Sequence, residues 1–242
     1  MSQKEFTILF NELEGILKKK YNLKKEDSIS KAINMAKNDA KNNPIKNNIE
    51  VIEVIRELRN LITHQPNLKI TEIADPSAEL VLVLRKIVEQ YSKPKRIGSY
   101  MKENNFKNIV SFSSNDNLKE VLDKVSEFQY SQFPVFDKES YIGMITDNGI
   151  TNWIANSIDA ESNLIENLKD VKIEKIITFE EKQNNVVKIY KEETIFSLIS
   201  AFEEKEVNTV LICEKKNCII EKPTDLMGIM TTYDLKDLYK EI

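Results

Sequence analysis

Residues 228–235 read GIMTTYDL, and an imperfect copy of this stretch, GMITDNGI, occupies residues 143–150. In each copy an apolar run ends in Gly-x-x-Thr, and an apolar helix start follows shortly after. The pattern predicts a strand, a threonine and then a helix. Thr146 and Thr231 should therefore lie beside the N–H groups of a helix's first turn, with the Asp234 carboxylate close by. Such a place suits a phosphate and a ribose.

This repeated motif, with a strand such as 133–137 (FPVFD) upstream of it, resembles the pair of CBS domains that forms a Bateman module. The resemblance covers residues 96–242. It implies two β-α-β-β-α repeats, at 96–158 and 170–242, related by a pseudo-twofold axis with two clefts between them. It also implies a ligand that contains adenosine, such as AMP, ADP, ATP, S-adenosylmethionine or cyclic di-AMP.

In the CBS family, the threonine of the motif holds phosphate and the aspartate holds ribose. Carried over to this chain, these roles fall on Thr231 and Asp234 in the second repeat and on Thr146 in the first, where Gly149 replaces the aspartate. The residues alone also allow a simpler interpretation, in which Thr231 caps the next helix and Asp234 adds a favourable charge to its first turn. By the resemblance, the adenine would rest against Met230, Asn208 and Thr209.

The order of apolar runs and turn residues predicts matching elements in the two repeats. The first repeat should contain a strand at 108–112, a helix that begins after Asn117, a hairpin of 132–136 and 141–145, and a helix at 148–157. The second should contain a strand at 186–189, a helix at 194–205, strands at 209–213 and 226–230, an extra strand at 218–220, and a closing helix at 233–241.

Residues 1–92 show the spacing of amphipathic helices. Four antiparallel helices of this length predict a small bundle. The fold class is therefore expected to be α+β, with a four-helix bundle followed by the two repeats. The expected helices are 5–21, a second one that is capped by Asp27 or Ser28 and runs to about residue 41, then 46–64 and 77–91.

The third of these helices carries Arg59, Asn60 and His64. This spacing resembles the R-x4-6-H signature of HEPN domains, small helical bundles of which many are metal-independent ribonucleases that act as dimers. A histidine can serve as general acid or base on a ribose 2′-hydroxyl, and an arginine can stabilise the charged phosphorane. Two simpler roles stay open: His64 caps the helix end, and Arg59 pairs with Glu53 or Glu57.

Composition excludes several classes of function. The 242 residues suffice for two domains, and the formal charge of −4 argues against bulk electrostatic binding of DNA or RNA. With one histidine and two cysteines, no metal centre is expected, and the chain has no P-loop and no G-x-G-x-x-G. No apolar run approaches the ~20 residues of a membrane span, and the N-terminus lacks a signal-peptide core. We therefore expect a cytoplasmic protein without membrane contact.

Together these features predict a regulatory sensor, in which an adenine nucleotide binds between the CBS repeats and the helical domain responds. Because both families favour homodimers, a homodimer is expected. One alternative is a nucleotide-gated ribonuclease that acts on RNA through Arg59 and His64 of two subunits. A second alternative is a dimerisation module that binds no ligand.

Overall fold

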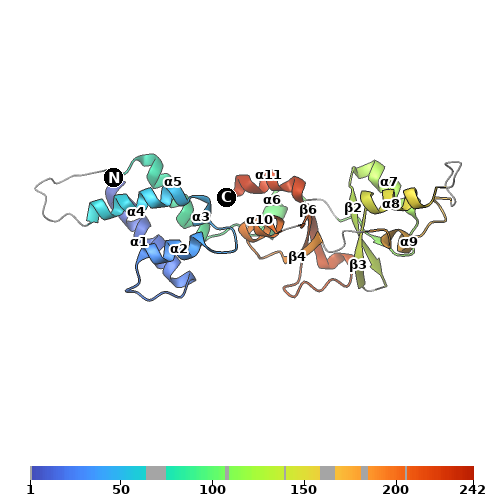
Figure 1. Cartoon of the computed structure of the whole chain (residues 1–242), viewed down its shortest axis with the longest axis horizontal. Coiled ribbons are helices and arrows are strands. Elements are labelled where there is room, and N and C mark those ends of the chain that lie inside the picture. The colour runs from blue at the N-terminus through green and yellow to red at the C-terminus, as the bar shows by residue number, and fades with distance from the viewer. Residues whose placement is uncertain are drawn as a thin grey trace, which may run out of the picture. The chain divides into compact units, whose positions relative to one another are not determined.

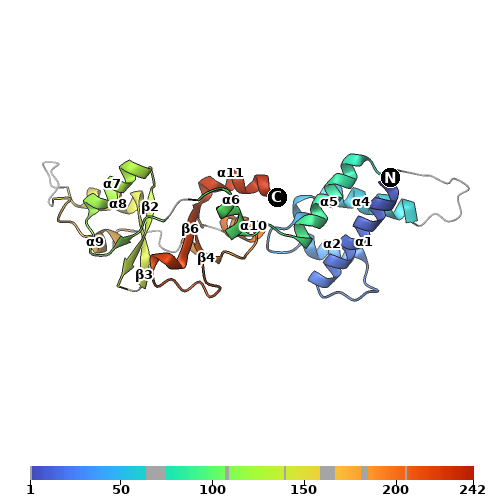
Figure 2. The same ribbon diagram turned by 180° about the vertical axis from the view of Figure 1, so that it is seen from behind.

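The computed structural model describes residues 2–63, 75–106, 109–138, 140–158, 167–180, 185–204 and 206–242. The contacts group these residues into two compact units, whose elements are labelled in Figure 1 and seen from behind in Figure 2. The first unit comprises Met1–Lys95, Thr194–Ser200 and Asp237–Ile242. The second comprises Arg96–Glu193 and Ala201–Lys236.

The first unit is built mainly from helices near the N-terminus. Phe6, Phe10 and Leu13 of α1 are fully buried in a core shared with the other helices, as their spacing predicts. α1 contacts α2 and α5, and α4 contacts α5, while the four-helix bundle topology stays a prediction. The helices are α1 Ser2–Lys20, α2 Ile29–Lys37, α3 Pro44–Asn47, α4 Ile49–Thr63 and α5 Ala78–Ser92.

Caps decide where these helices begin. The side chains of Ser28 and Ser77 accept from the N–H groups of Lys31 and Leu80, so α2 and α5 begin where the sequence predicts. Pro44, by contrast, opens a helix of its own, because a proline fits the first helical position. Residues 46–64 therefore do not form one helix: α3 ends at Asn47 and α4 begins at Ile49.

The second unit holds two three-stranded sheets with the same topology. In each, the first strand pairs in parallel with the second, and the second pairs antiparallel with the third. This confirms the predicted pair of mixed α and β repeats. The residues expected as an extra strand at 218–220 form none, although the Ile220 carbonyl accepts from the Tyr141 N–H. The strands are β1 Phe112–Ser113, β2 Gln132–Asp137, β3 Ser140–Thr146, β4 Val186–Tyr190, β5 Thr209–Cys213 and β6 Leu226–Thr231.

The helices and turns of the repeats follow the predicted order. The first repeat has α7 Leu118–Phe128 between β1 and β2, and α8 Asp147–Asn156 after β3. The second has α10 Ile195–Glu203 between β4 and β5. β6 is followed by three short turns of helix: η3 Thr232–Asp234, α11 Leu235–Leu238 and η4 Tyr239–Glu241.

Two short helices that the sequence pattern did not predict connect the repeats. α9 Ile173–Ile177 precedes the second repeat but buries Ile173 and Ile176 in the core of the first, beside Trp153. α6 Ile97–Glu103 precedes the first repeat but is bonded to the second, since the Ile97 N–H donates to the Glu193 carbonyl at 3.0 Å. Each repeat therefore holds the helix that leads into the other.

A shared core joins the two sheets. Its buried members come from both repeats, so the inner faces of the sheets lie against each other. This packing brings the ends of β3 and β6, where the repeated motifs lie, into one region of the second unit. The buried residues of this core are Phe136, Met144, Leu211, Cys213, Ile220 and Leu226. Among the described residues, no helix combines the length and the apolar character needed to cross a membrane.

Candidate functional site

The second unit contains a cavity of about 560 Å³ between the two repeats. Its volume lies in the range typical of small-molecule sites, about 300–1,000 Å³. The second repeat contributes the end of β6 and the turn after it, including Thr231 and Asp234. The first repeat contributes the chain before β1 and the turn between α7 and β2. The lining residues of the first repeat include Phe106, Ile109, Val110, Tyr130, Ser131 and Gln132.

At the polar end of this larger cavity, Thr231 and Asp234 are held by each other. The Thr231 N–H donates to Oδ2 of Asp234 at 2.7 Å, and the Thr231 hydroxyl lies 3.3 Å from the same oxygen. Oγ1 of Thr231 accepts from the Tyr233 N–H at 3.3 Å, so the pair forms a capping box at the start of η3. The predicted capping role is thus present, and both side chains also line the cavity.

Much of the remaining lining of the larger cavity is apolar and aromatic. Ile109, Val110 and Ile229 supply branched aliphatic surface, and Tyr130 supplies a ring. A planar aromatic group gains from burial against such surface, while hydroxyl or phosphate groups find partners at the Thr231 end. The larger cavity is therefore suited to a ligand with a flat apolar part and a polar part.

A second, smaller cavity of about 230 Å³ lies where the end of β3 faces the second repeat. Thr146, Asp147 and Asn148 line it from the first repeat, and Asn208 and Thr209 from the second. The two repeats are linked here directly, because the Thr209 hydroxyl donates to Oε1 of Gln132 at 2.7 Å. Ser131, Gln132, Thr231 and Tyr233 line both cavities, so the two are neighbours.

Glu180 is the residue of the smaller cavity that sequence reasoning missed. Its Oε1 accepts from the Thr146 N–H at 2.6 Å, and its Oε2 accepts from the Thr146 hydroxyl at 2.8 Å. Burial raises the pKa of the Glu180 carboxyl, although these two hydrogen bonds act in the opposite direction. The one signal in the sequence was the glycine at 149, which left a carboxylate position of the motif empty.

The structure divides the predicted ligand contacts between the two cavities. Asp234 lines the larger one, Thr146, Asn208 and Thr209 line the smaller one, and Thr231 lines both. Met230 is fully buried, because successive side chains of β6 point to opposite faces and Thr231 takes the cavity side. Ile229 lines the larger cavity instead. The ligand-binding roles of these residues stay predictions.

Two of the proposed ribonuclease residues, Arg59 and Asn60, lie near the end of α4. The Arg59 guanidinium sits over the Phe10 ring, 5.5 Å from its centroid, and Asn60 is exposed. His64 lies outside the described residues, so the ribonuclease hypothesis stays a prediction. Within the described ranges, no three His, Cys, Asp or Glu side chains form a group that could hold a metal ion.

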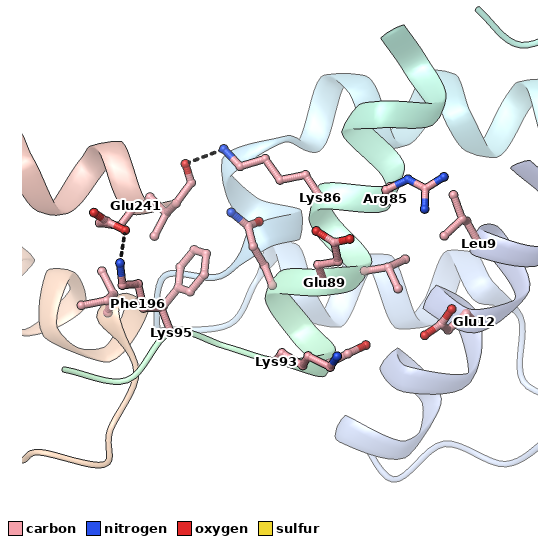
Figure 3. A pocket seen from close by; sticks show the side chains of 14 residues that line it. Leu9, Glu12, Arg85, Lys86, Glu89, Lys93, Lys95, Phe196 and Glu241 are labelled. Atoms are coloured by element: carbon pink, nitrogen blue, oxygen red, sulfur yellow. Dashed lines mark hydrogen bonds and ion pairs between the residues drawn. The ribbon is translucent and has the colours of Figure 1, made fainter. Parts of the chain in front are cut away.

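The first unit has a cavity of its own, of about 540 Å³, which Figure 3 shows. It lies among α1, α5, the beginning of α10 and the C-terminal residues. Two lysines reach from the α5 side to the last residues of the chain: Lys95 Nζ lies 2.7 Å from Oε2 of Glu241, and Lys86 Nζ donates to the Ile242 carbonyl at 3.0 Å (Figure 3). These contacts fix the residues that follow α11 within the helical unit.

Comparison with known proteins supports the resemblance in the first repeat. The family model of the CBS domain matches residues 97–156, which confirms the CBS domain predicted there. No curated protein matches the chain significantly.

Three similar solved structures are all CBS domains. One, from a CBS domain containing membrane protein of Sphaerobacter thermophilus, has 16% identity and a TM-score of 0.44, and the match covers 64% of this chain and 93% of that one. A CBS domain-containing protein of unknown function from Bacillus anthracis has 18% identity, coverage of 61% and 94%, and a TM-score of 0.41. The CBS domain of a bacterial CNNM/CorC family Mg²⁺ transporter, in complex with ATP, has 15% identity, coverage of 66% and 93%, and a TM-score of 0.40.

Proposed function

We propose that this chain is a regulatory sensor that binds an adenine nucleotide in the larger cavity and passes the bound state to the N-terminal helical region. The observation that carries the proposal is the pairing, in one cavity, of an apolar wall from the first repeat with Thr231 and Asp234 from the second. The CBS family match adds support, because CBS domains generally bind ligands that contain adenosine.

The proposed roles follow from the chemistry of the cavity. The purine lies against Ile109, Val110 and Ile229, where its apolar surface is removed from water. The Asp234 carboxylate accepts from the ribose hydroxyls, and the Thr231 hydroxyl donates to phosphate. The Thr231 N–H keeps its bond to Asp234 while the Thr231 hydroxyl turns from Asp234 to the phosphate, so ligand binding orders few additional groups.

The route to the helical region is short along the chain. Asp234 is separated by two residues from the segment Asp237–Ile242, which belongs to the compact helical unit. Glu241 and Ile242 of this segment are held by Lys95 and Lys86. A ligand that shifts the turn at Asp234 therefore acts on a segment that the helical unit contacts.

Thermal unfolding with a nucleotide panel tests the proposal. The purified chain is heated with AMP, ADP, ATP, cyclic di-AMP, S-adenosylmethionine or, as control, GTP. A ligand present at about 100 times its dissociation constant adds ~2.7 kcal/mol to the free energy of unfolding, so the midpoint rises clearly. We expect a rise with at least one adenine ligand and none with GTP. A flat response to all adenine ligands would reject the sensor function.

Two variants identify the cavity that is responsible. Asp234→Ala removes the carboxylate and should clearly reduce the rise caused by the ligand, because the larger cavity no longer contributes to it, while it lowers the unliganded midpoint through loss of the cap. Asp234→Asn keeps an oxygen that can accept from the Thr231 N–H, so its unliganded midpoint should stay near that of the unmodified chain. If both variants keep the full response to ligand, the nucleotide binds elsewhere.

A further inference from the structure

The first repeat lacks the carboxylate of its own motif, yet its threonine has a carboxylate partner. In the second repeat, Oδ2 of Asp234 accepts from the N–H of Thr231 and lies within hydrogen-bond distance of its hydroxyl. In the first repeat, Glu180 accepts from the same two groups of Thr146, at 2.6 and 2.8 Å. Glu180 is 34 residues away from Thr146 and leads into the second repeat, so this carboxylate is supplied from outside the motif.

Gly149 is the reason that Glu180 fits there. It stands where the second motif has Asp234, and a Cβ added to it would overlap Oε1 of Glu180. A side chain at position 149 would therefore displace the carboxylate of Glu180 from its present position. The glycine at position 149 leaves the space that the Glu180 carboxylate occupies beside Thr146.

We propose that Glu180 takes over the role of the missing aspartate and makes the smaller cavity a second nucleotide site, in which its carboxylate accepts from the vicinal hydroxyls of a ribose. This inference rests on the proposed function. Glu180 lines the cavity together with Thr146, Asn208 and Thr209. A carboxylate offers about four acceptor positions, and Thr146 uses two of them, so acceptor positions remain for ribose hydroxyls.

Calorimetric titration with AMP tests the role of Glu180. The Asp234→Ala variant serves as background, because Asp234 lines the larger cavity and not the smaller one, where Thr146 and Glu180 are bonded to each other. In this background, Glu180→Ala should weaken AMP binding about 10- to 100-fold, the loss expected for hydrogen bonds to a charged group. The same substitution, Glu180→Ala, should have little effect on the binding of 2′,3′-dideoxyadenosine 5′-monophosphate, which lacks both hydroxyls.

A rescue variant separates a binding role from damage to the fold. Adding Gly149→Asp to Glu180→Ala places a carboxylate at the position of the motif, in space that Glu180 has left, and should restore AMP binding. The emission of Trp153, the one tryptophan of the chain, checks the fold, since this residue is fully buried on α8 beside the site. All variants should keep the same emission maximum.

Several results would overturn the inference. If the unmodified chain binds one AMP and Asp234→Ala abolishes this binding, the second site is rejected and the sensor function is not. If Glu180→Ala leaves AMP binding to the Asp234→Ala background unchanged or makes it tighter, Glu180 only fills the cavity. Absence of AMP binding to the unmodified chain would reject the second site, and the nucleotide panel would then decide the sensor function separately.

Discussion

Carboxylates that accept backbone N–H groups hold several turns of this protein. Asp225 does so most clearly, in the connection between β5 and β6. Its side chain is buried, and Oδ2 accepts from the N–H groups of Glu221 and Lys222 at 3.0 and 3.1 Å. Lys215 lies 2.9 Å from Oδ1, so the charge of the carboxylate is compensated. These contacts hold residues 215–225 in place without the strand that was expected there.

The Asp225 contacts predict a specific dependence of stability on pH. The bond to Lys215 and the two backbone bonds lower the pKa of the Asp225 carboxyl to about 2, against about 3.9 in an unfolded chain. A lowered pKa contributes stability above the unfolded value, and this contribution is lost as the pH falls from about 4 to about 2. Asp225→Asn should therefore be less stable than the unmodified chain near neutral pH, and the difference should shrink across that window.

Urea unfolding at a series of pH values measures this difference. Asp237→Asn is the matched control, because Asp237 is exposed and pairs with Lys240 on the surface, where such pairs contribute little. It should differ little from the unmodified chain throughout. A constant gap between Asp225→Asn and the unmodified chain from neutral to acid pH would contradict the assigned ionisation.

At the scale of elements, one amide joins three helices of the first unit. Oδ1 of Asn43 accepts from the Lys46 N–H at the start of α3 and from the Tyr91 hydroxyl of α5, both at 3.1 Å. Its Nδ2 donates to the Ala36 carbonyl near the end of α2 at 2.9 Å and to the Lys41 carbonyl at 3.2 Å. Because Asn43 is almost fully buried, water does not replace these partners readily.

Asn43→Ala should accordingly destabilise the chain by about 3 kcal/mol or more, since it leaves several buried groups unpaired. Ser77→Ala removes a single cap, that of α5, and should cost about 1 kcal/mol. Tyr91→Phe removes one of the Asn43 bonds and should fall near the smaller value. Urea unfolding of the three variants gives the order, and equal costs for Asn43→Ala and Ser77→Ala would refute the joining role.

Elements were predictable from the sequence where they carry a repeated pattern or a cap. The strands β2, β5 and β6 alternate or run apolar between turn residues, and Ser77 marks the start of α5. The helices α6 and α9, with 7 and 5 residues, are too short for a periodic signal. Glu180 was not predictable, because its partner Thr146 is distant in the chain and a motif records only local spacing.

At the scale of the whole molecule, the proposed function requires that a nucleotide bound in the second unit affects the first. The first unit includes Thr194–Ser200 and Asp237–Ile242, two segments that continue directly into parts of the second. Within the first unit, the Asn42 N–H donates to the Ser200 hydroxyl at 2.6 Å, and Lys95 pairs with Glu241. These bonds connect the two segments to the helices.

Hydrogen exchange should report this connection. Addition of the nucleotide found in the thermal panel should slow exchange of backbone N–H groups in residues 228–235 and also in 237–242 and at Asn42. Exchange slows where local opening becomes rarer. The double variant Lys86→Ala, Lys95→Ala removes the bonds to Ile242 and Glu241 and keeps the bond between Asn42 and Ser200, so slowing should persist at 228–235 and weaken at 237–242. Protection confined to 228–235 in the unmodified chain would reject the connection.

The crossed placement of α6 and α9 has a consequence for synthesis on the ribosome. Met101 of α6 is buried and contacts the second repeat so closely that a Cβ at Gly228 would overlap its methyl group. At a synthesis rate of about 5–20 residues per second, α6 leaves the ribosome roughly ten seconds before β6, the strand that contains Gly228. The core of the first repeat likewise stays incomplete until Ile173 and Ile176 have been synthesised. A nascent chain that stalls between the repeats therefore exposes apolar surface that chaperones bind.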